Sequence, residues 1–206
     1  MPGIDRQNSA GPDADARALE DLALVERAKA ELPYRTKAFE ELMRRHESLL
    51  YGVCLRLVNS RADAEDVCQE VMVKVFSAIQ RFEARSSFKT WLMRIATNTC
   101  STWRDRARRS REVAAVWAEL KAQEADDPMP TASMDISSLL EQLKPREREI
   151  ITLRYVADLD LKEIAEVCGL GLSATKMRLY RATERLQSLA GLTDDEDKSS
   201  GRGTRN

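Results

Sequence analysis

The sequence is poor in the residues that most often build catalytic and metal sites. It contains a single histidine, His46, and its four cysteines are far apart, with no C-x-x-C pair. It also lacks a glycine-rich phosphate loop and any cluster of residues with metal-ligand spacing. These absences argue against an enzyme and against a metalloprotein. We therefore expect no cofactor, no bound metal and no small-molecule substrate.

Long apolar runs are also absent. No stretch approaches the ~18 apolar residues of a membrane span, and no charged-then-apolar leader opens the sequence. The cysteines lie among apolar residues of expected helices, which favours buried free thiols over a redox or zinc role. Free thiols indicate a reducing compartment, so we expect a cytoplasmic protein. The four thiols are Cys54, Cys68, Cys100 and Cys168.

A strong charge of one sign is missing as well. The 33 Lys and Arg residues and 34 Asp and Glu residues leave a formal net charge of −1, which argues against a protein that coats nucleic acid through bulk charge. The charges are nevertheless polarised along the chain. Between residues 81 and 111, nine Lys and Arg residues face two acidic residues, whereas acids gather in 63–70, 119–127 and 193–197. The sequence therefore predicts one basic surface on a nearly neutral protein.

Strand patterns are absent, and helical spacing takes their place. Apolar residues from 19 to 111 recur with a helical period, and Gly52 is the only glycine among them, which predicts a helical bundle. Residues 112–135 begin with helix formers and end in acids, prolines and small residues, which is typical of a linker. We predict an all-α protein with two small helical domains joined by a flexible acidic linker. The predicted divisions are a disordered N-terminus (1–18), a bundle (19–111), the linker (112–135), a second helical domain (136–191) and a disordered tail (192–206).

The basic stretch itself has the pattern of a helix. In FKTWLMRIATNTCSTWRDRARRSR (88–111), apolar and small residues recur at helical spacing and predict a buried face. Arginines then follow with only Asp105 to offset them. The pattern predicts a helix that packs through one face and carries a basic track. Its expected buried positions are Phe88, Trp91, Leu92, Ile95, Ala96 and Thr99.

The segment LKEIAEVCGLGLSATKMRLY (161–180) fits a DNA-reading helix-turn-helix. Gly169 stands where the turn between the two helices favours a left-handed backbone. The expected inward positions are Ile164, Ala165, Cys168, Leu172, Thr175 and Leu179. The expected exposed positions of the second helix are Ser173, Ala174, Lys176, Met177, Arg178, Tyr180 and Arg181. Exposed residues at the start of such a helix contact base edges, and basic residues anchor phosphates. The alternative is an ordinary pair of helices with a solvated basic face.

Three stretches together resemble one family. The segment DAEDVCQEVMVKVF (63–76) resembles the core-polymerase-binding helix of sigma factors, and FKTWLMRIATNTCSTWRDRARR (88–109) resembles the helix that melts the −10 element. Residues 143–182, which include the helix-turn-helix, resemble region 4, the reader of the −35 element. The order and spacing of the three are similar to those of an extracytoplasmic-function (ECF, group 4) sigma factor of the bacterial sigma-70 family.

The resemblance implies a function and a set of partners. It implies an alternative sigma factor that binds core RNA polymerase, through the β′ and β subunits, and directs initiation at particular promoters. Region 4 would read −35 DNA, and region 2 would melt the −10 element without ATP or metal by stabilising unpaired bases. Promoter DNA and an anti-sigma factor, membrane-bound or soluble, are the other implied partners. The acidic linker would thread the polymerase cleft or act as a passive tether.

The resemblance also assigns residues to three surfaces. The implied core-polymerase-binding residues are Asp63, Glu65, Asp66, Gln69, Glu70 and Val73. The implied −10 residues are Phe82, Ser86, Ser87, Lys89, Arg94, Asn98, Ser101, Thr102, Trp103 and Arg104. The implied −35 residues are Ser173, Ala174, Lys176, Met177, Arg178 and Arg181. Trp91 fits the core stripe first, whereas for Trp103 stacking on a base and packing in the bundle both stay open.

Two departures from the family pattern and one rival function complete the interpretation. Thr102 stands where many members carry an acid or asparagine, and Met177 alters the −35 reading surface, so the promoter sequence cannot be copied from relatives. The rival is a conventional helix-turn-helix regulator that acts without replacing the sigma subunit. Such a regulator predicts an effector-binding or dimerisation module in place of a small arginine-rich bundle.

Overall fold

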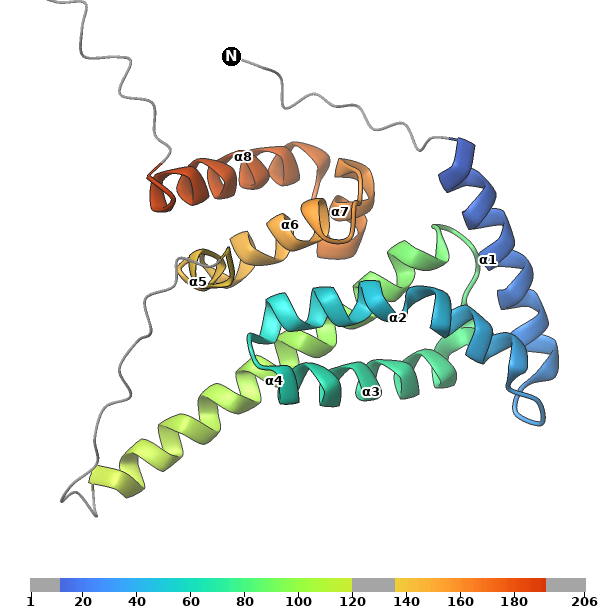
Figure 1. The fold of residues 1–206 in the computed structure, drawn as a ribbon, viewed down its shortest axis with the longest axis horizontal. Helices are drawn as coiled ribbons and strands as arrows, with labels where there is room; N and C mark the ends of the chain where they lie inside the picture. The colour runs from blue at the N-terminus through green and yellow to red at the C-terminus, as the bar shows by residue number, and fades with distance from the viewer. Residues whose placement is uncertain (1–11, 120–135, 192–206) are drawn as a thin grey trace, which may run out of the picture.

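The computed structural model describes residues 12–119 and 136–191, and every regular element in these two ranges is helical (Figure 1). The prediction of an all-α protein is thereby confirmed. The elements are α1 (Pro12–Glu31), α2 (Lys37–Val58), α3 (Arg61–Ala78), the short 3₁₀ helix η1 (Ile79–Arg81), α4 (Phe88–Glu119), α5 (Ile136–Glu141), α6 (Pro145–Tyr155), α7 (Leu161–Cys168) and α8 (Leu172–Leu189).

Helices α1 to α4 form the N-terminal bundle. Helices α2 and α3 make a tight hairpin, because Asn59 ends α2 in a left-handed conformation (φ 60°) and Ser60 caps α3 by accepting a hydrogen bond from Asp63 N (3.3 Å). Helix α4 packs against both members of the hairpin, and α1 packs across α2 (Figure 1). Leu57 and Leu92 are among the large side chains that are wholly or almost wholly buried in this bundle.

Two boundaries differ from those expected. Helix α1 begins at Pro12, so residues 12–18 are helical although glycine and proline nearby suggested disorder. Proline fits the first position of a helix because its missing N–H has no helical partner there. Helix α4 extends to Glu119, eight residues into the expected linker. The disorder expected for 1–11 and 192–206 and the flexibility expected for 120–135 lie outside the described residues.

Helices α5 to α8 form the C-terminal module, in which α6 and α7 pack against α8. Helix α7 begins with a reciprocal cap: Asp160 Oδ1 accepts from Glu163 N (2.8 Å), and Glu163 Oε2 accepts from Asp160 N (2.9 Å). It ends at Gly169, whose left-handed conformation (φ 64°) turns the chain toward α8. The left-handed turn expected at this glycine is confirmed.

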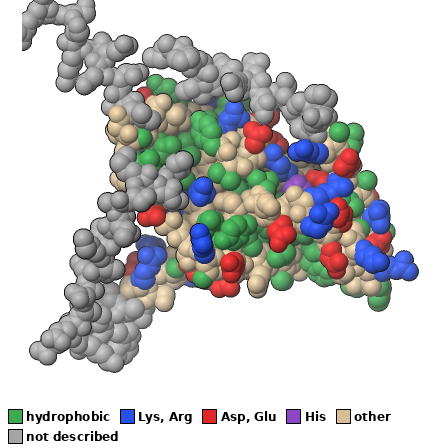
Figure 2. All heavy atoms as spheres, viewed as in Figure 1, with side chains coloured by type: hydrophobic (Ala, Val, Ile, Leu, Met, Phe, Trp, Pro, Cys, Tyr) green, Lys and Arg blue, Asp and Glu red, His purple; other side chains and the backbone are tan. Residues whose placement is uncertain are grey.

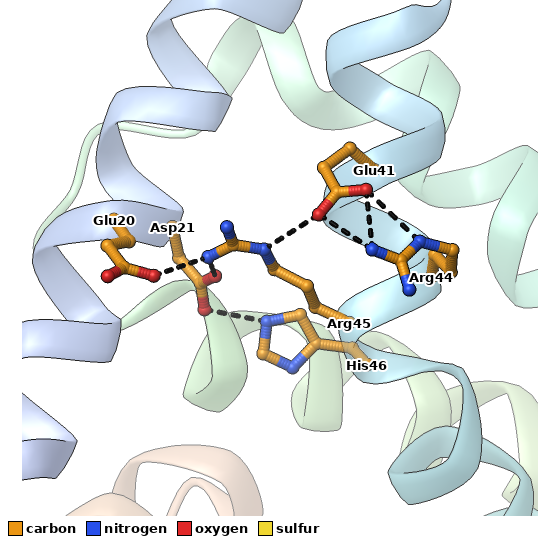
Figure 3. Close-up of polar contacts among 6 residues, drawn as sticks. All are labelled: Glu20, Asp21, Glu41, Arg44, Arg45 and His46. Carbon is orange, nitrogen blue, oxygen red and sulfur yellow. Dashed lines mark hydrogen bonds and ion pairs between the residues drawn. The ribbon is translucent and has the colours of Figure 1, made fainter.

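A polar network ties α1 to α2 on one side of the bundle (Figure 3). Asp21 and His46 are both more than nine-tenths buried, and Asp21 Oδ2 lies 2.7 Å from His46 Nε2. Beside them Arg45 reaches between the two helices, donating to Glu20 Oε2 (2.9 Å) and to Glu41 Oε1 (3.2 Å). The chain's one histidine therefore has a structural partner inside the bundle.

We predict that Asp21→Ala destabilises the bundle far more than Glu20→Ala. Removing the Asp21 carboxylate leaves the buried imidazole of His46 without its partner, which costs about 1–3 kcal/mol, whereas the exposed Glu20–Arg45 pair contributes about 0–1 kcal/mol. Urea denaturation of both variants measures the difference. Equal losses would show that the buried pair contributes no more than a surface ion pair.

Candidate nucleic-acid interface

Helix α4 presents the expected face to the bundle. Phe88, Leu92, Ala96 and Thr99 are at most 3% exposed, and Trp91 is half-buried, as the periodicity predicted. The helix is also buried at positions outside that face, namely Thr90, Met93, Thr97 and Cys100. This wider burial follows because α4 contacts α1, α2 and α3 in the bundle and also α7 of the C-terminal module.

One stripe of α4 stays open to solvent. Arg94, Asn98 and Thr102 are exposed, and Ser101 between them is half-buried. These residues follow one another at i, i+4, i+7 and i+8, so they share a side of the helix. Thr102 Oγ1 donates to the backbone carbonyl oxygen of Asn98 (3.0 Å), so this bond does not involve the Asn98 side-chain amide. The stripe combines a guanidinium, an amide and hydroxyls, which suits a nucleic-acid backbone or an unpaired base.

Several expected −10 residues take structural positions instead. Phe82 is only 4% exposed, and its ring centroid lies 5.1 Å from that of Trp91, so it fills the core. Ser87 caps α4, because its hydroxyl accepts from Thr90 N (3.1 Å). Trp103 is half-buried and packs against the core, which favours the packing alternative for this residue.

The other expected −10 residues are half-buried. Ser86 lies in the loop before α4, and Lys89 lies in the first turn of the helix. Arg104 Nη1 is buried without a hydrogen-bond partner among the described residues. In the free chain Phe82 and Ser87 therefore support the loop and the helix, and their contact with −10 DNA stays a prediction.

The C-terminal module covers the start of α4. Thr90 Oγ1 donates to Glu163 Oε1 of α7 (2.7 Å), and Lys89 Nζ donates to Asp158 O (3.2 Å). A third contact joins the Asn59 side-chain amide, after α2, to the Glu141 carboxylate of α5. Lys89, expected on the DNA surface, is therefore occupied by a contact within the protein.

The contact between the two modules continues between α2 and α6, which also pack against each other (Figure 1). A side chain at Gly52 would place its Cβ 3.5 Å from Val156 Cγ1, so the backbone of α2 approaches the end of α6 closely there. Together with the contacts at α4, this packing holds the two modules in one closed arrangement.

Helix α3 carries the expected acidic stripe. Glu65, Asp66 and Gln69 are exposed, and Val73 is 65% exposed at the centre of the same side. Asp63 is half-buried near the cap of the helix. An exposed apolar residue beside carboxylate and amide groups suits a partner that offers a basic helix.

Two residues of α3 differ from the expectation. Glu70 is half-buried and ion-paired with Lys74 (2.7 Å) and Arg106 (3.9 Å), so part of its charge is already compensated. Phe76 continues the apolar spacing of the buried residues Val71 and Val75 of α3, yet it is 37% exposed and lies edge-on to Phe39, with ring centroids 5.2 Å apart. On the face drawn in Figure 2, basic and acidic side chains intermingle over the bundle.

Helix α8 has the exposure pattern of a recognition helix. All six of the expected −35 residues are exposed: Ser173, Ala174, Lys176, Met177, Arg178 and Arg181. Thr175 and Leu179 are buried as expected. Leu172, expected in the core, is 48% exposed because it is the first residue of α8. Helix α7 packs against α8 across the turn at Gly169, which is the arrangement of a helix-turn-helix.

The chain carries a helical bundle with a basic helix, and a helix-turn-helix follows it in the sequence. This combination is typical of a two-module promoter-binding protein, and comparison with known proteins agrees with this class. Residues 42–110 match the family model for Sigma-70 region 2, and residues 133–186 match that for Sigma-70, region 4. The chain is 33% identical over 159 residues to RNA polymerase sigma factor CarQ of Myxococcus xanthus, spanning 75% of this chain and 90% of that protein. It is 30% identical over 186 residues to the ECF RNA polymerase sigma-E factor of Haemophilus influenzae, spanning 84% and 96%.

Solved structures show the same likeness. The structure of CnrH in complex with the cytosolic domain of CnrY has a TM-score of 0.63 and 26% identity, covering 84% of this chain and 99% of that one. Sigma factor RpoE of Bartonella quintana, in complex with the anti-sigma factor NepR, has a TM-score of 0.61 and 25% identity, covering 77% and 99%. The chain belongs to the ECF sigma factors of the sigma-70 family and is an alternative sigma factor.

The contacts between the modules were missed by sequence reasoning. The D-x-x-E spacing of Asp160 and Glu163 signals a helix start, but nothing in it indicates that Glu163 also binds Thr90 on a distant helix. The partner of His46 was likewise not foreseen. Within the described ranges, no helix combines the length and apolar character that crossing a bilayer requires.

We predict that Thr90→Val loosens the closed arrangement. Valine keeps the shape of threonine but removes the hydroxyl that donates to the Glu163 carboxylate, a bond of about 1.5–3 kcal/mol because its acceptor is charged. Small-angle X-ray scattering should then show a larger radius of gyration at unchanged helical content. Thr102→Val is the matched control, since that hydroxyl bonds only within α4. An unchanged radius for Thr90→Val would mean that this bond does not hold the modules together.

Proposed function

We propose that the two modules divide promoter recognition, with α8 reading −35 DNA and the exposed stripe of α4 holding the unpaired −10 strand. The match of the two modules to regions 2 and 4, in that order, carries this proposal. The exposure of Arg178 and Lys176 on α8 and of Arg94 and Asn98 on α4 supports it. A conventional regulator is not favoured, because the family match extends over both modules.

The closed arrangement must open before both elements are bound. The −35 and −10 elements lie about 25 base pairs apart, which is roughly 85 Å at about 3.4 Å per base pair. The two modules instead touch through Thr90 and Glu163, and Lys89 is bonded to the backbone of Asp158. We infer that core polymerase separates the modules and frees the start of α4. The free chain should accordingly be a poor binder of promoter duplex.

The acidic stripe of α3 is the proposed docking edge for core polymerase. Asp66, Gln69 and Val73 are exposed on it, whereas Glu70 already pairs with Lys74. A basic helix of the β′ subunit offers the complementary charge, and Val73 supplies the apolar centre that such interfaces use. Asp66 and Gln69 therefore carry more of this proposal than Glu70.

The wider setting follows from the family. Sigma factors are non-enzymatic initiation factors that act with core RNA polymerase on promoter DNA, and we propose that this chain does so in the cytoplasm without a cofactor or catalytic activity of its own. The RpoE structure contains the anti-sigma factor NepR, and the CnrH structure contains the cytosolic domain of CnrY. We propose that this chain too is held inactive by an anti-sigma partner.

Charge reversal tests the docking edge. Asp66→Lys should reduce co-purification with core polymerase by at least about tenfold, because it places a cation opposite a basic partner. Far-ultraviolet circular dichroism should be unchanged, since Asp66 is exposed. Glu166→Lys makes the same charge change at an exposed position of α7 and should retain core binding. Undiminished core binding by Asp66→Lys would remove α3 from the interface.

A promoter with a pre-melted bubble separates the two DNA surfaces. Arg178→Ala should weaken closed-complex binding by about 1–3 kcal/mol and relax preference at the −35 element. Asn98→Ala and Arg94→Ala should instead slow strand opening, followed by permanganate reactivity of −10 thymines. The bubble should restore part of the strand-opening defect of Asn98→Ala and Arg94→Ala, because the free-energy cost of unpairing the bases is already met. It should not restore the binding defect of Arg178→Ala. The same response to the bubble in both sets would contradict the division of labour.

A further inference from the structure

One carboxylate of α3 is tied to the helix that carries the basic track. The Glu70 side chain is 29% exposed, and its two oxygens lie beside different cations. Oε1 lies 2.7 Å from Lys74 Nζ, and Oε2 lies 3.9 Å from Arg106 Nη1 of α4. Lys74 Nζ in turn donates to Thr99 Oγ1 of α4 (3.1 Å). Glu70 therefore reaches α4 by two routes, one direct and one through Lys74.

Arg106 stands at the edge of the exposed stripe of α4. It follows Thr102, the last residue of that stripe, by one helical turn. It also follows the buried Thr99 by two turns, so it borders the side of α4 that faces α3. Its side chain is 64% exposed, and its 3.9 Å distance to Glu70 is too long for a hydrogen bond. A guanidinium in this position can turn either to the carboxylate of α3 or to a nucleic-acid strand that follows the stripe.

The other arginines at this end of α4 have different surroundings. Arg108 pairs with Glu112 of its own helix (3.6 Å), so docking on α3 does not reach that pair. Arg111 donates to the backbone carbonyl oxygen of Ala107 (3.3 Å). Within residues 12–119, Arg106 is the arginine of α4 that pairs with a carboxylate of α3.

We propose that Glu70 holds Arg106 away from DNA in the free chain and releases it when core polymerase docks. The release rests on the proposed docking of α3. A basic partner helix that meets Asp66 also brings positive charge to Glu70, one turn further along α3. It displaces Arg106 readily, because a loose and exposed ion pair contributes little to stability. The freed guanidinium then binds a phosphate beside the exposed stripe, so Glu70 acts as a positioning residue that couples docking to DNA binding.

Binding of single-stranded DNA by the full free chain tests the restraint. The probe is a fluorescein-labelled oligothymidine, since a phosphate contact does not depend on sequence, and anisotropy measures its affinity at several salt concentrations. Glu70→Gln should bind about two- to fivefold more tightly than the wild type, which is the range that an exposed ion pair allows. The slope of log K against log salt concentration should steepen by about 0.7, the value for one added phosphate contact on a single strand.

Glu47→Gln is the matched control for the lost charge. Glu47 is exposed on α2 and has no ion-pair partner among the described residues. Its substitution removes one carboxylate from the same bundle without freeing a cation, so affinity and salt slope should stay at the wild-type values. Equal affinities for Glu70→Gln and the wild type would overturn the restraint.

A second substitution identifies the released group. Arg106→Ala alone should change the affinity of the free chain little, because Glu70 already occupies the guanidinium. In the double variant, Glu70→Gln with Arg106→Ala, the gain in affinity and the steeper salt slope should both disappear. A gain that persists without Arg106 would come from Lys74 or from the lost charge itself, and it would overturn the inference. Far-ultraviolet circular dichroism checks that each variant is folded.

The holoenzyme tests the release. With core polymerase bound, Arg106→Ala should weaken binding to a promoter with a pre-melted bubble by at least about twofold and should make the salt slope shallower. An unchanged affinity in the holoenzyme would overturn the release of Arg106. A wild-type chain that does not bind core polymerase at all would instead contradict the proposed function, and the measurements on the free chain would stand independently.

Discussion

The structure depends on the burial of α4 from two directions. Its first three turns fill the centre of the bundle through Phe88, Leu92 and Ala96, and its first turn is also covered by α7 through Thr90. Because one helix serves as an inner wall for both modules, whatever moves the C-terminal module away also uncovers the start of α4. In the proposed function, this shared packing contact links the two DNA-binding surfaces.

Sequence periodicity predicted α2, α4 and α8 well because the buried residues of each of these helices recur at helical spacing. The buried face of α4, the left-handed turn at Gly169 and the exposed face of α8 all follow from local spacing and backbone preference. Local rules failed where burial depends on a neighbour from elsewhere in the chain. Phe82 looked available in its loop but fills the core beside Trp91.

The candidate surfaces divide in the same way. Helical spacing alone places Asp66 and Gln69 on an open side of α3 and Arg178 on an open side of α8. The state of Lys89 could not be predicted, because its partner is the backbone carbonyl of Asp158, 69 residues further along the chain. Cys54, Cys68 and Cys100 were each expected inside the helical bundle, and all three are buried there.

Glu163 uses its two carboxylate oxygens for different purposes. Oε2 accepts from the backbone N–H of Asp160 and caps the start of α7, whereas Oε1 accepts from Thr90 of α4 in the other module. Separation of the modules breaks only the second bond, and water can replace the lost donor at Oε1. The helix start keeps its own cap throughout, so the DNA-reading module can detach as an intact unit, with no local unfolding to reverse before it meets DNA.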